Sequence, residues 1–245
     1  MSVTFVTAFF KPTRHYRNVE TYFALFDQLA SSGVPILLYL DEAYIDRTFP
    51  LNVSILPTRL DTSWLPSNPV LPSQRNPEKD TPEYFCIQLS KLRYLADAVQ
   101  HVETPFLAWI DFGVFHMFRQ PNVSKLLLRT IAQSEWPRHR ILSPGCRRIE
   151  VSWDYPVWWF CGSFLLGHRD LWRPAYQRQT EIVREHLPRL TWEVNVWTHM
   201  ADLFVIYQAN HNDTLLMRAM QLVQRHPGVE TCSKTPANIQ ASTTD

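Results

Sequence analysis

An aspartate that directly follows an apolar run is the first candidate for chemistry in this sequence. Residues 105–110 read Pro-Phe-Leu-Ala-Trp-Ile, Asp111 follows them, and Gly113 comes two residues later. A short apolar run bounded by proline and glycine is typical of a buried strand in a parallel sheet. Asp111 would then lie at the carboxyl end of that strand, where open α/β sheets bind their ligands. The alternative is an aspartate that only caps the next helix.

A histidine near the other end of the chain is a possible partner for this aspartate. His211 follows the apolar run 203–207, which predicts the last strand. If both strands end at the same edge of the sheet, the Asp111 carboxylate, the His211 imidazole and diphosphate oxygens could coordinate Mn²⁺ or Mg²⁺. Equally, His211 could line or cap the final helix without any metal.

Glu193 is the candidate general base. It lies four residues before Trp197 in the segment 191–200, which the spacing predicts to be a helix, so the two side chains share a face. In a cleft with apolar walls, the carboxyl of Glu193 would have the raised pKa that a general base requires. The alternative is a surface glutamate favoured by the dipole at the start of its helix.

Lys91 falls on the apolar side of a helix predicted from about Pro82 to Val99. A lysine in that position either extends its ammonium group to solvent or meets an anion. A diphosphate is one such anion, because lysine binds phosphate as a point charge. The sequence leaves both interpretations open.

Two adjacent tryptophans, Trp158 and Trp159, open the most aromatic segment of the chain and shortly precede Gly162 and Ser163. Tryptophan faces commonly bind sugar rings, and glycine permits a ligand to approach the backbone closely. The alternative is that at least one of the two tryptophans is simply buried in the core.

The elements that would position these residues follow an α/β pattern. Strands are predicted at 3–10, 35–40 and 53–56, and a helix with its apolar residues at helical spacing is predicted at 18–30. Strands that alternate with helices imply a mostly parallel central sheet flanked by helices. Further helices are expected at 123–132, 170–186, with Asp170 as its N-cap, and 214–224, and a strand at 140–142.

The segment from Pro50 to Pro82 is rich in proline and has little room for long regular elements. We interpret it as an ordered excursion on the surface. It is either a lid or wall on the acceptor side of the site, or an inert loop.

Composition excludes several classes of protein. Lys and Arg number 24 against 23 Asp and Glu, so the chain has no basic footprint for nucleic acid. No apolar run approaches the roughly 20 residues that span a bilayer. The amino terminus shows no signal peptide, and the four cysteines are widely spaced, which predicts reduced thiols and a cytoplasmic location. The motifs of P-loop NTPases, dinucleotide oxidoreductases, zincins and α/β-hydrolases are absent from the sequence.

Taken in order, several segments resemble the HtrL/YibB-like family, which is related to WlaTC-type sugar-transferring proteins and similar to GT-A glycosyltransferases. The matching segments are Val3–Phe10, Thr81–Tyr84 with Lys91, Pro105–Gly113, Cys161–Gly167, Thr191–Glu193 and His211–Asp213. The resemblance implies a single GT-A (Rossmann-like) domain over residues 1–226, which binds a nucleotide-sugar, and a flexible tail over 227–245.

The resemblance also implies roles for individual residues. The base and ribose of a UDP- or GDP-type donor would contact Thr7, Ala8 and Phe9, and Lys91 would meet its phosphates or sugar. Gly162 and Ser163 would face the donor sugar, Asp111 and His211 would hold Mn²⁺ or Mg²⁺, and Glu193 would deprotonate the acceptor. The Asp-x-Asp motif typical of such enzymes is incomplete: either Asp111 is its last acid and Trp109 occupies the place of the first, or Asp111 is its first acid and Gly113 replaces the last, and we favour the former. Asp41 or a backbone group would then contact the ribose.

The function expected from these residues is a metal-dependent transfer of sugar from a nucleoside-diphosphate sugar to a hydroxyl acceptor, in glycan or polysaccharide synthesis. One alternative is a sugar nucleotidyltransferase, but the basic residues Lys11 and Arg14 after the first strand lack the usual glycines. Another is a nucleotide- or sugar-binding module without catalysis. The sequence leaves open the donor sugar and base, the acceptor, the stereochemical outcome and the oligomeric state.

Overall fold

Seven strands form one sheet in the order β3-β2-β1-β4-β6-β5-β7 in the computed structural model, which describes residues 1–11, 18–145, 151–210 and 212–225. The strands are β1 (Val3–Phe9), β2 (Ile36–Asp41), β3 (Val53–Thr58), β4 (Phe106–Ile110), β5 (Ile141–Gly145), β6 (Phe164–His168) and β7 (Phe204–Gln208). Strand β6 runs antiparallel to β4 and β5, and the other pairs in the sheet are parallel. The predicted α/β class with a mostly parallel sheet is therefore confirmed.

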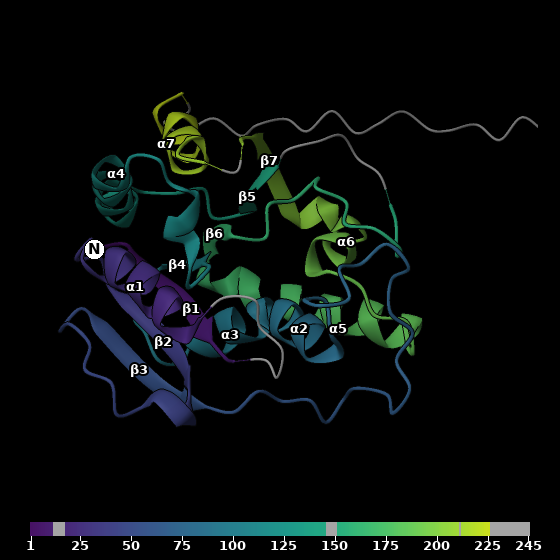
Figure 1. The fold of residues 1–245 in the computed structure, drawn as a ribbon. Helices are drawn as coiled ribbons and strands as arrows, with labels where there is room; N and C mark the ends of the chain where they lie inside the picture. The colour runs from purple at the N-terminus through teal and green to yellow at the C-terminus, as the bar shows by residue number, and fades with distance from the viewer. Residues whose placement is uncertain (12–17, 146–150, 211, 226–245) are drawn as a thin grey trace, which may run out of the picture.

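Helices cover both faces of this sheet (Figure 1). They are α1 (Val19–Ala30), α2 (Pro82–Leu89), α3 (Lys91–Ala98), α4 (Pro121–Gln133), α5 (Trp172–His186), α6 (Glu193–Thr198) and α7 (Thr214–Arg225). Short 3₁₀ turns lie at Glu42–Tyr44, Val114–Met117, Arg169–Leu171 and Ala201–Leu203. Helices α1, α4 and α7 supply side chains to one apolar cluster, and α2, α3, α5 and α6 supply side chains to a second.

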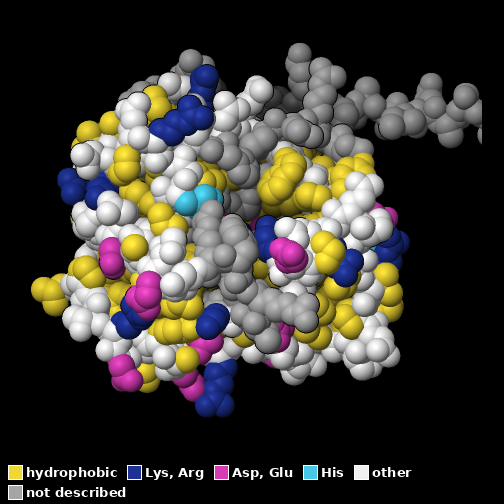
Figure 2. All heavy atoms as spheres, in the orientation of Figure 1, with side chains coloured by type: hydrophobic (Ala, Val, Ile, Leu, Met, Phe, Trp, Pro, Cys, Tyr) yellow, Lys and Arg dark blue, Asp and Glu magenta, His cyan; other side chains and the backbone are white. Residues whose placement is uncertain are grey.

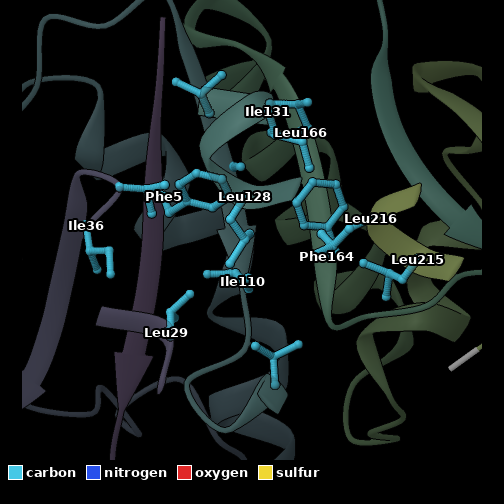
Figure 3. Packing of buried hydrophobic residues seen from close by; sticks show 14 of the residues in the cluster. Phe5, Leu29, Ile36, Ile110, Leu128, Ile131, Phe164, Leu166, Leu215 and Leu216 are labelled. Carbon is cyan, nitrogen blue, oxygen red and sulfur yellow. The ribbon is translucent and has the colours of Figure 1, made fainter. Parts of the chain in front are cut away.

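The alternation of side chains along each strand divides the core between these two clusters. In β1, Phe5 packs with the cluster under α1, whereas Val6 packs with the cluster under α3. Figure 3 shows the first cluster, in which strand residues such as Phe5 and Phe164 lie among leucine side chains of the helices. Because both faces are covered, the central strands are almost wholly apolar, as the sequence pattern predicts.

The helix predicted from Pro82 to Val99 is two helices, which is a correction to the sequence interpretation. Helix α2 ends at Leu89 and α3 begins at Lys91. Between them, the Ser90 hydroxyl donates a hydrogen bond of 2.7 Å to the carbonyl of Cys86, four residues earlier. Such a bond competes for the helix carbonyl and bends or interrupts the helix. The break makes Lys91 the first residue of α3.

Asp170 is not the N-cap of α5, which is a second correction. It lies inside the 3₁₀ turn Arg169–Leu171, and the residue that caps this turn is His168, whose side chain accepts from the Asp170 amide. Helix α5 begins after the turn, at Trp172, and has no side-chain cap. The 3₁₀ turn satisfies the first amides locally, so the acid that the sequence suggested as a cap is displaced into the turn.

The proline-rich segment from Pro50 to Pro82 is ordered and contains β3 near its start. Beyond β3 it is held by backbone contacts rather than by long elements, as predicted. The Gln74 amide donates to the carbonyl of Asp154 (3.0 Å), and the Val70 amide donates to the carbonyl of Pro188 (2.9 Å). These contacts fasten it to the loop that precedes Trp158 and to the segment between α5 and α6.

On the face drawn in Figure 2, basic and acidic side chains are interspersed rather than segregated. Cys86 and Cys161 are buried free thiols, and Cys146 and Cys232 lie outside the described residues, as does the tail 227–245. In the described part of the chain, no helix combines the length and hydrophobicity needed to cross a bilayer.

Candidate active site

A buried lysine lies at the centre of the candidate site. The Nζ atom of Lys91 is 2.8 Å from Oε1 of Glu193, 2.8 Å from the carbonyl oxygen of Gly162 and 3.1 Å from Oδ1 of Asp111. An ammonium group has three N–H donors, and here three acceptors surround it. Lys91 is only 2% exposed, so these contacts replace the water that it loses on folding.

Three separate elements supply the charged side chains of this cluster. Strand β4 ends at Ile110, which pairs with Phe164, the first residue of the antiparallel strand β6. The residues just beyond this pair therefore meet: the Asp111 amide donates to the carbonyl of Ser163 (3.0 Å). The two other elements are α3, which begins with Lys91, and α6, which begins with Glu193.

The charges of the cluster keep the lysine protonated. Burial by itself lowers the pKa of Lys91, but the negative charges of Asp111 and Glu193, with their hydrogen bonds, outweigh it and raise the pKa above its ordinary value. With two carboxylates and one ammonium group, the cluster of Lys91, Asp111 and Glu193 carries a formal charge of minus one.

Trp109 orients the aspartate. Its indole Nε1 donates a hydrogen bond of 2.8 Å to Oδ1 of Asp111, the same oxygen that contacts Lys91. Oδ2 of Asp111 and Oε2 of Glu193 have no hydrogen-bond partner among the described residues. Asp111 is also 38% exposed at its side chain, whereas Glu193 is 5% exposed. Each carboxylate thus uses one oxygen within the cluster and retains the other for a ligand.

Gly162 is required by the closeness of the cluster to the backbone. A Cβ atom at this position would lie 2.2 Å from Oε1 of Glu193 and 3.2 Å from Nζ of Lys91. The first distance is far below van der Waals contact, and Oε1 cannot withdraw without breaking its ion pair with the lysine.

We therefore expect Gly162→Ala to separate Glu193 from Lys91 and to destabilise the fold by about 1–3 kcal/mol, the usual range for overpacking a closely packed site. Urea unfolding measures this loss. Gly113→Ala is the control, because its Cβ would meet only side-chain atoms, those of Tyr22 at 3.1 Å and of Leu25 at 3.6 Å. An equal loss in the two variants would contradict the claim that position 162 is specially constrained.

The cluster opens onto a cavity of about 500 Å³, within the usual range for small-ligand sites. The walls come from the carboxyl ends of β1 and β4, from α1, α2, α3 and α6, from the segments just after β4 and just before β6, and from two further loops. One loop is the proline-rich segment, which contributes Gln74 and Asn76, and the other contains Trp158. The first loop therefore forms a wall of the cavity, one of the two possibilities left open by the sequence.

Most of the predicted site residues meet at this cavity. The lining includes Ala8, Phe9, Lys91, Trp109, Asp111, Gly162, Ser163 and Glu193. Thr7 does not line it: this side chain is fully buried within the sheet. Asp41 does not line the cavity either. Its carboxylate accepts a hydrogen bond of 3.0 Å from the Ala43 amide and caps the following turn. His211 lies outside the described residues.

Two buried amides that the sequence did not indicate hold the site together. Asn195 accepts from the Val157 amide (2.7 Å) and donates to the carbonyl of Tyr155 (2.9 Å), which fixes the Trp158 loop to α6. Gln179 of α5 donates to the carbonyl of Leu89 in α2 (2.7 Å) and accepts from the indole of Trp197 in α6 (2.8 Å). The only sequence signal is an amide in a helical segment, and most such residues are exposed.

The described residues contain no group of three His, Cys, Asp or Glu side chains arranged to hold a metal ion. Within the Lys91 cluster, Asp111 has a partly exposed side chain and one carboxylate oxygen without a partner among the described residues, and Mg²⁺ and Mn²⁺ prefer such oxygen ligands. These residues fit a cation that shares its other ligands with a bound substrate, since Mg²⁺ commonly takes one or two carboxylates and substrate phosphates.

No known family model matches this chain, and no curated protein matches its sequence. We assign no family. Among solved structures, the chain is similar to the bifunctional IspDF of Campylobacter jejuni, with a TM-score of 0.45 and 10% identity over 86% of this chain, and it spans 50% of that chain. It is also similar to CMP:2-keto-3-deoxy-manno-octonic acid synthetase in complex with CTP, with a TM-score of 0.42 and 8% identity. That match covers 92% of this chain and 100% of the synthetase. Similarities this distant concern the fold alone.

Proposed function

We propose that this protein is a glycosyltransferase that uses a nucleoside-diphosphate sugar, and that the cavity beside Lys91 is its active site. The observation that carries the proposal is the pair of acids, Asp111 and Glu193, which a buried ammonium group bridges at the carboxyl end of β4. Both acids line the cavity, and each retains one unpaired oxygen. One carboxylate can then accept a proton while the other binds a cation.

Glu193 is the proposed base. Its Oε1 is held by Lys91 and its Oε2 has no partner among the described residues, so Oε2 can accept a proton from an acceptor hydroxyl. The hydroxyl oxygen forms a bond to the anomeric carbon, the bond from that carbon to the diphosphate oxygen breaks, and the proton goes to Oε2 of Glu193. This scheme applies to an inverting transfer; in a retaining one Glu193 would have a different role.

The charge of the cavity favours a cation-dependent site. Three acids, Asp80, Asp111 and Glu193, and two lysines, Lys79 and Lys91, lie among the described lining residues, an excess of one negative charge. A nucleoside diphosphate is itself anionic, and the three N–H donors of Lys91 already have acceptors. A divalent cation held by Asp111 would neutralise charge on the departing diphosphate.

A sugar nucleotidyltransferase is the second candidate, and the synthetase noted above belongs to that class by its name. Such an enzyme must bind a nucleoside triphosphate, which carries more negative charge than a diphosphate sugar. The acid excess of the described lining favours the first candidate. Release of pyrophosphate from CTP and a sugar acid, without turnover of any nucleoside-diphosphate sugar, would support the second.

The test is nucleotide release from a panel of UDP-, GDP- and dTDP-sugars, with Mn²⁺ or with EDTA. We expect Mn²⁺-dependent release from one donor, and Glu193→Gln is expected to lower the rate of sugar transfer about 10²-fold, as is usual for loss of a general base. Glu185→Gln, an exposed position on α5, is the matched control. Equal transfer by the Glu193 variant would remove this residue from the mechanism, and no release from any donor would count against the proposed function.

A further inference from the structure

Polar side chains with unsatisfied hydrogen-bonding groups line one part of the cavity. They come from α2 and from the proline-rich segment that precedes it, and they are Gln74, Asn76, Lys79, Asp80, Tyr84 and Gln88. Four of these side chains have polar groups without a hydrogen-bond partner among the described residues. They are the side-chain amides of Gln74 and Gln88, Nδ2 of Asn76 and the hydroxyl of Tyr84. We call these six residues the polar wall.

Asp80 is the buried acid of the polar wall. Its residue exposure is 4%, and Oδ2 accepts a hydrogen bond of 2.9 Å from the Asn76 amide. Oδ1 is buried and has no hydrogen-bond partner among the described residues, and Nζ of Lys79 lies 3.8 Å from it. An unsatisfied buried carboxylate oxygen costs free energy of folding, and a hydrogen-bond donor on a ligand would recover this cost. Such a ligand would reach Oδ1 once the side chain of Lys79, which is 37% exposed, moves aside.

Tyr84 connects the polar wall to the Lys91 cluster. Its amide is fixed by Oγ1 of Thr81 at the start of α2 (3.2 Å), and Nζ of Lys79 lies 4.8 Å from the centre of its ring. Burial, followed by the negative charges of Glu193, Asp111 and Asp80, raises the pKa of Tyr84 well above its ordinary value. The phenol therefore stays protonated, and it can both donate and accept a hydrogen bond.

An aromatic surface lines the same cavity. Trp158 is 39% exposed, and Pro156 and Trp192 lie beside the cavity as well. The loop that carries Trp158 is held by the two hydrogen bonds of Asn195 described above. A tryptophan held in this way can pack against the C–H face of a ring while polar groups bind its edge.

We propose that the polar wall, together with Trp158, is a subsite for a neutral sugar ring of the acceptor, so that the acceptor is a carbohydrate. The inference rests on the proposed function, because it assigns the second substrate of the same cavity. Each ring hydroxyl both donates and accepts, which matches a wall that contains a carboxylate, a phenol and amides. An aliphatic alcohol would supply one hydroxyl and leave the other groups of the wall unpaired.

The test is binding of simple sugars, which is independent of donor turnover. The probes are the methyl glycosides of glucose, galactose and N-acetylglucosamine and the trisaccharides cellotriose and chitotriose, each observed by saturation-transfer NMR and titrated with the full chain. We expect one or more to bind, with affinity reduced roughly three- to tenfold in Tyr84→Phe and on the order of tenfold or more in Asp80→Asn.

The matched control is Tyr94→Phe. The Tyr94 side chain is also buried, but it lies outside the cavity lining, so this variant should bind the sugars as the unchanged protein does. Absence of binding by every probe, or equal loss in the Tyr84 and Tyr94 variants, would overturn the subsite. Sugar binding that depends on Tyr84 would support it even if no donor is turned over, whereas donor turnover without any sugar binding would leave the proposed function standing and overturn the subsite.

Discussion

Replacement of Lys91 by methionine is expected to destabilise the protein by about 3–5 kcal/mol and to abolish donor turnover. The variant removes the ammonium group that neutralises Asp111 and Glu193, and the carboxylate of Glu193 stays buried. An uncompensated buried charge is the costly outcome when one partner of a buried pair is removed. Urea unfolding gives the change in free energy, and nucleotide release gives the change in activity.

Two further variants separate the loss of charge from the loss of packing. Lys79→Met removes the other lysine of the cavity, whose side chain is 37% exposed, and should change stability by less than about 1 kcal/mol. The double variant Lys91→Met/Glu193→Gln removes the buried charge of Glu193 as well and should recover part of the lost stability. If the double variant is as unstable as the sum of its single changes, the ion pair is not the cause of the effect.

Asp111→Asn is expected to weaken Mn²⁺-dependent nucleotide binding strongly and to leave the fold intact. The amide oxygen of asparagine can still accept hydrogen bonds from Trp109 and Lys91, so the fold should persist. The neutral side chain, however, removes the only described carboxylate oxygen that is both unpaired and partly exposed beside Lys91. We expect Mn²⁺-dependent binding of UDP or GDP to weaken by about 10²-fold, equivalent to about 3 kcal/mol.

Calorimetric titration of the nucleotide with Mn²⁺ and with EDTA measures this change. Asp41→Asn is the matched control, because Asp41 also ends a parallel strand but caps the Ala43 amide and does not line the cavity. The affinity of the Asp41→Asn variant for the nucleotide with Mn²⁺ should equal that of the unchanged protein. Unchanged Mn²⁺-dependent affinity in Asp111→Asn would place the cation elsewhere.

The sequence predicted the α/β architecture because hydrophobic periodicity is local. The apolar runs that became β1, β2 and β4 and the spacing that became α1 and α4 each depend on a few neighbouring residues. The position of Asp111 at the end of β4 follows from the same pattern. The helix break at Ser90 was missed, because a serine bonded to the carbonyl four residues earlier has the same sequence signature as one that faces solvent.

Hydrophobic periodicity could not predict which side chains of the central strands face the cavity. A strand buried on both sides is apolar throughout, so no alternation shows which residues point toward the cavity. Thr7 and Asp41 were therefore expected at the site on the strength of the resemblance, although neither lines the cavity. Ala8 and Phe9, the neighbours of Thr7, do line it.

The chain by itself thus determined the order of the elements and the aspartate at a strand end, both of which depend on short-range patterns. Only the tertiary structure decided that Lys91 contacts Gly162 and Glu193, which are 71 and 102 residues away along the chain. It also decided that the proline-rich segment and α2 together line the cavity as the polar wall. Contacts over such separations depend on strand order and helix packing, and an ion pair leaves no periodic trace in either of the segments that it joins.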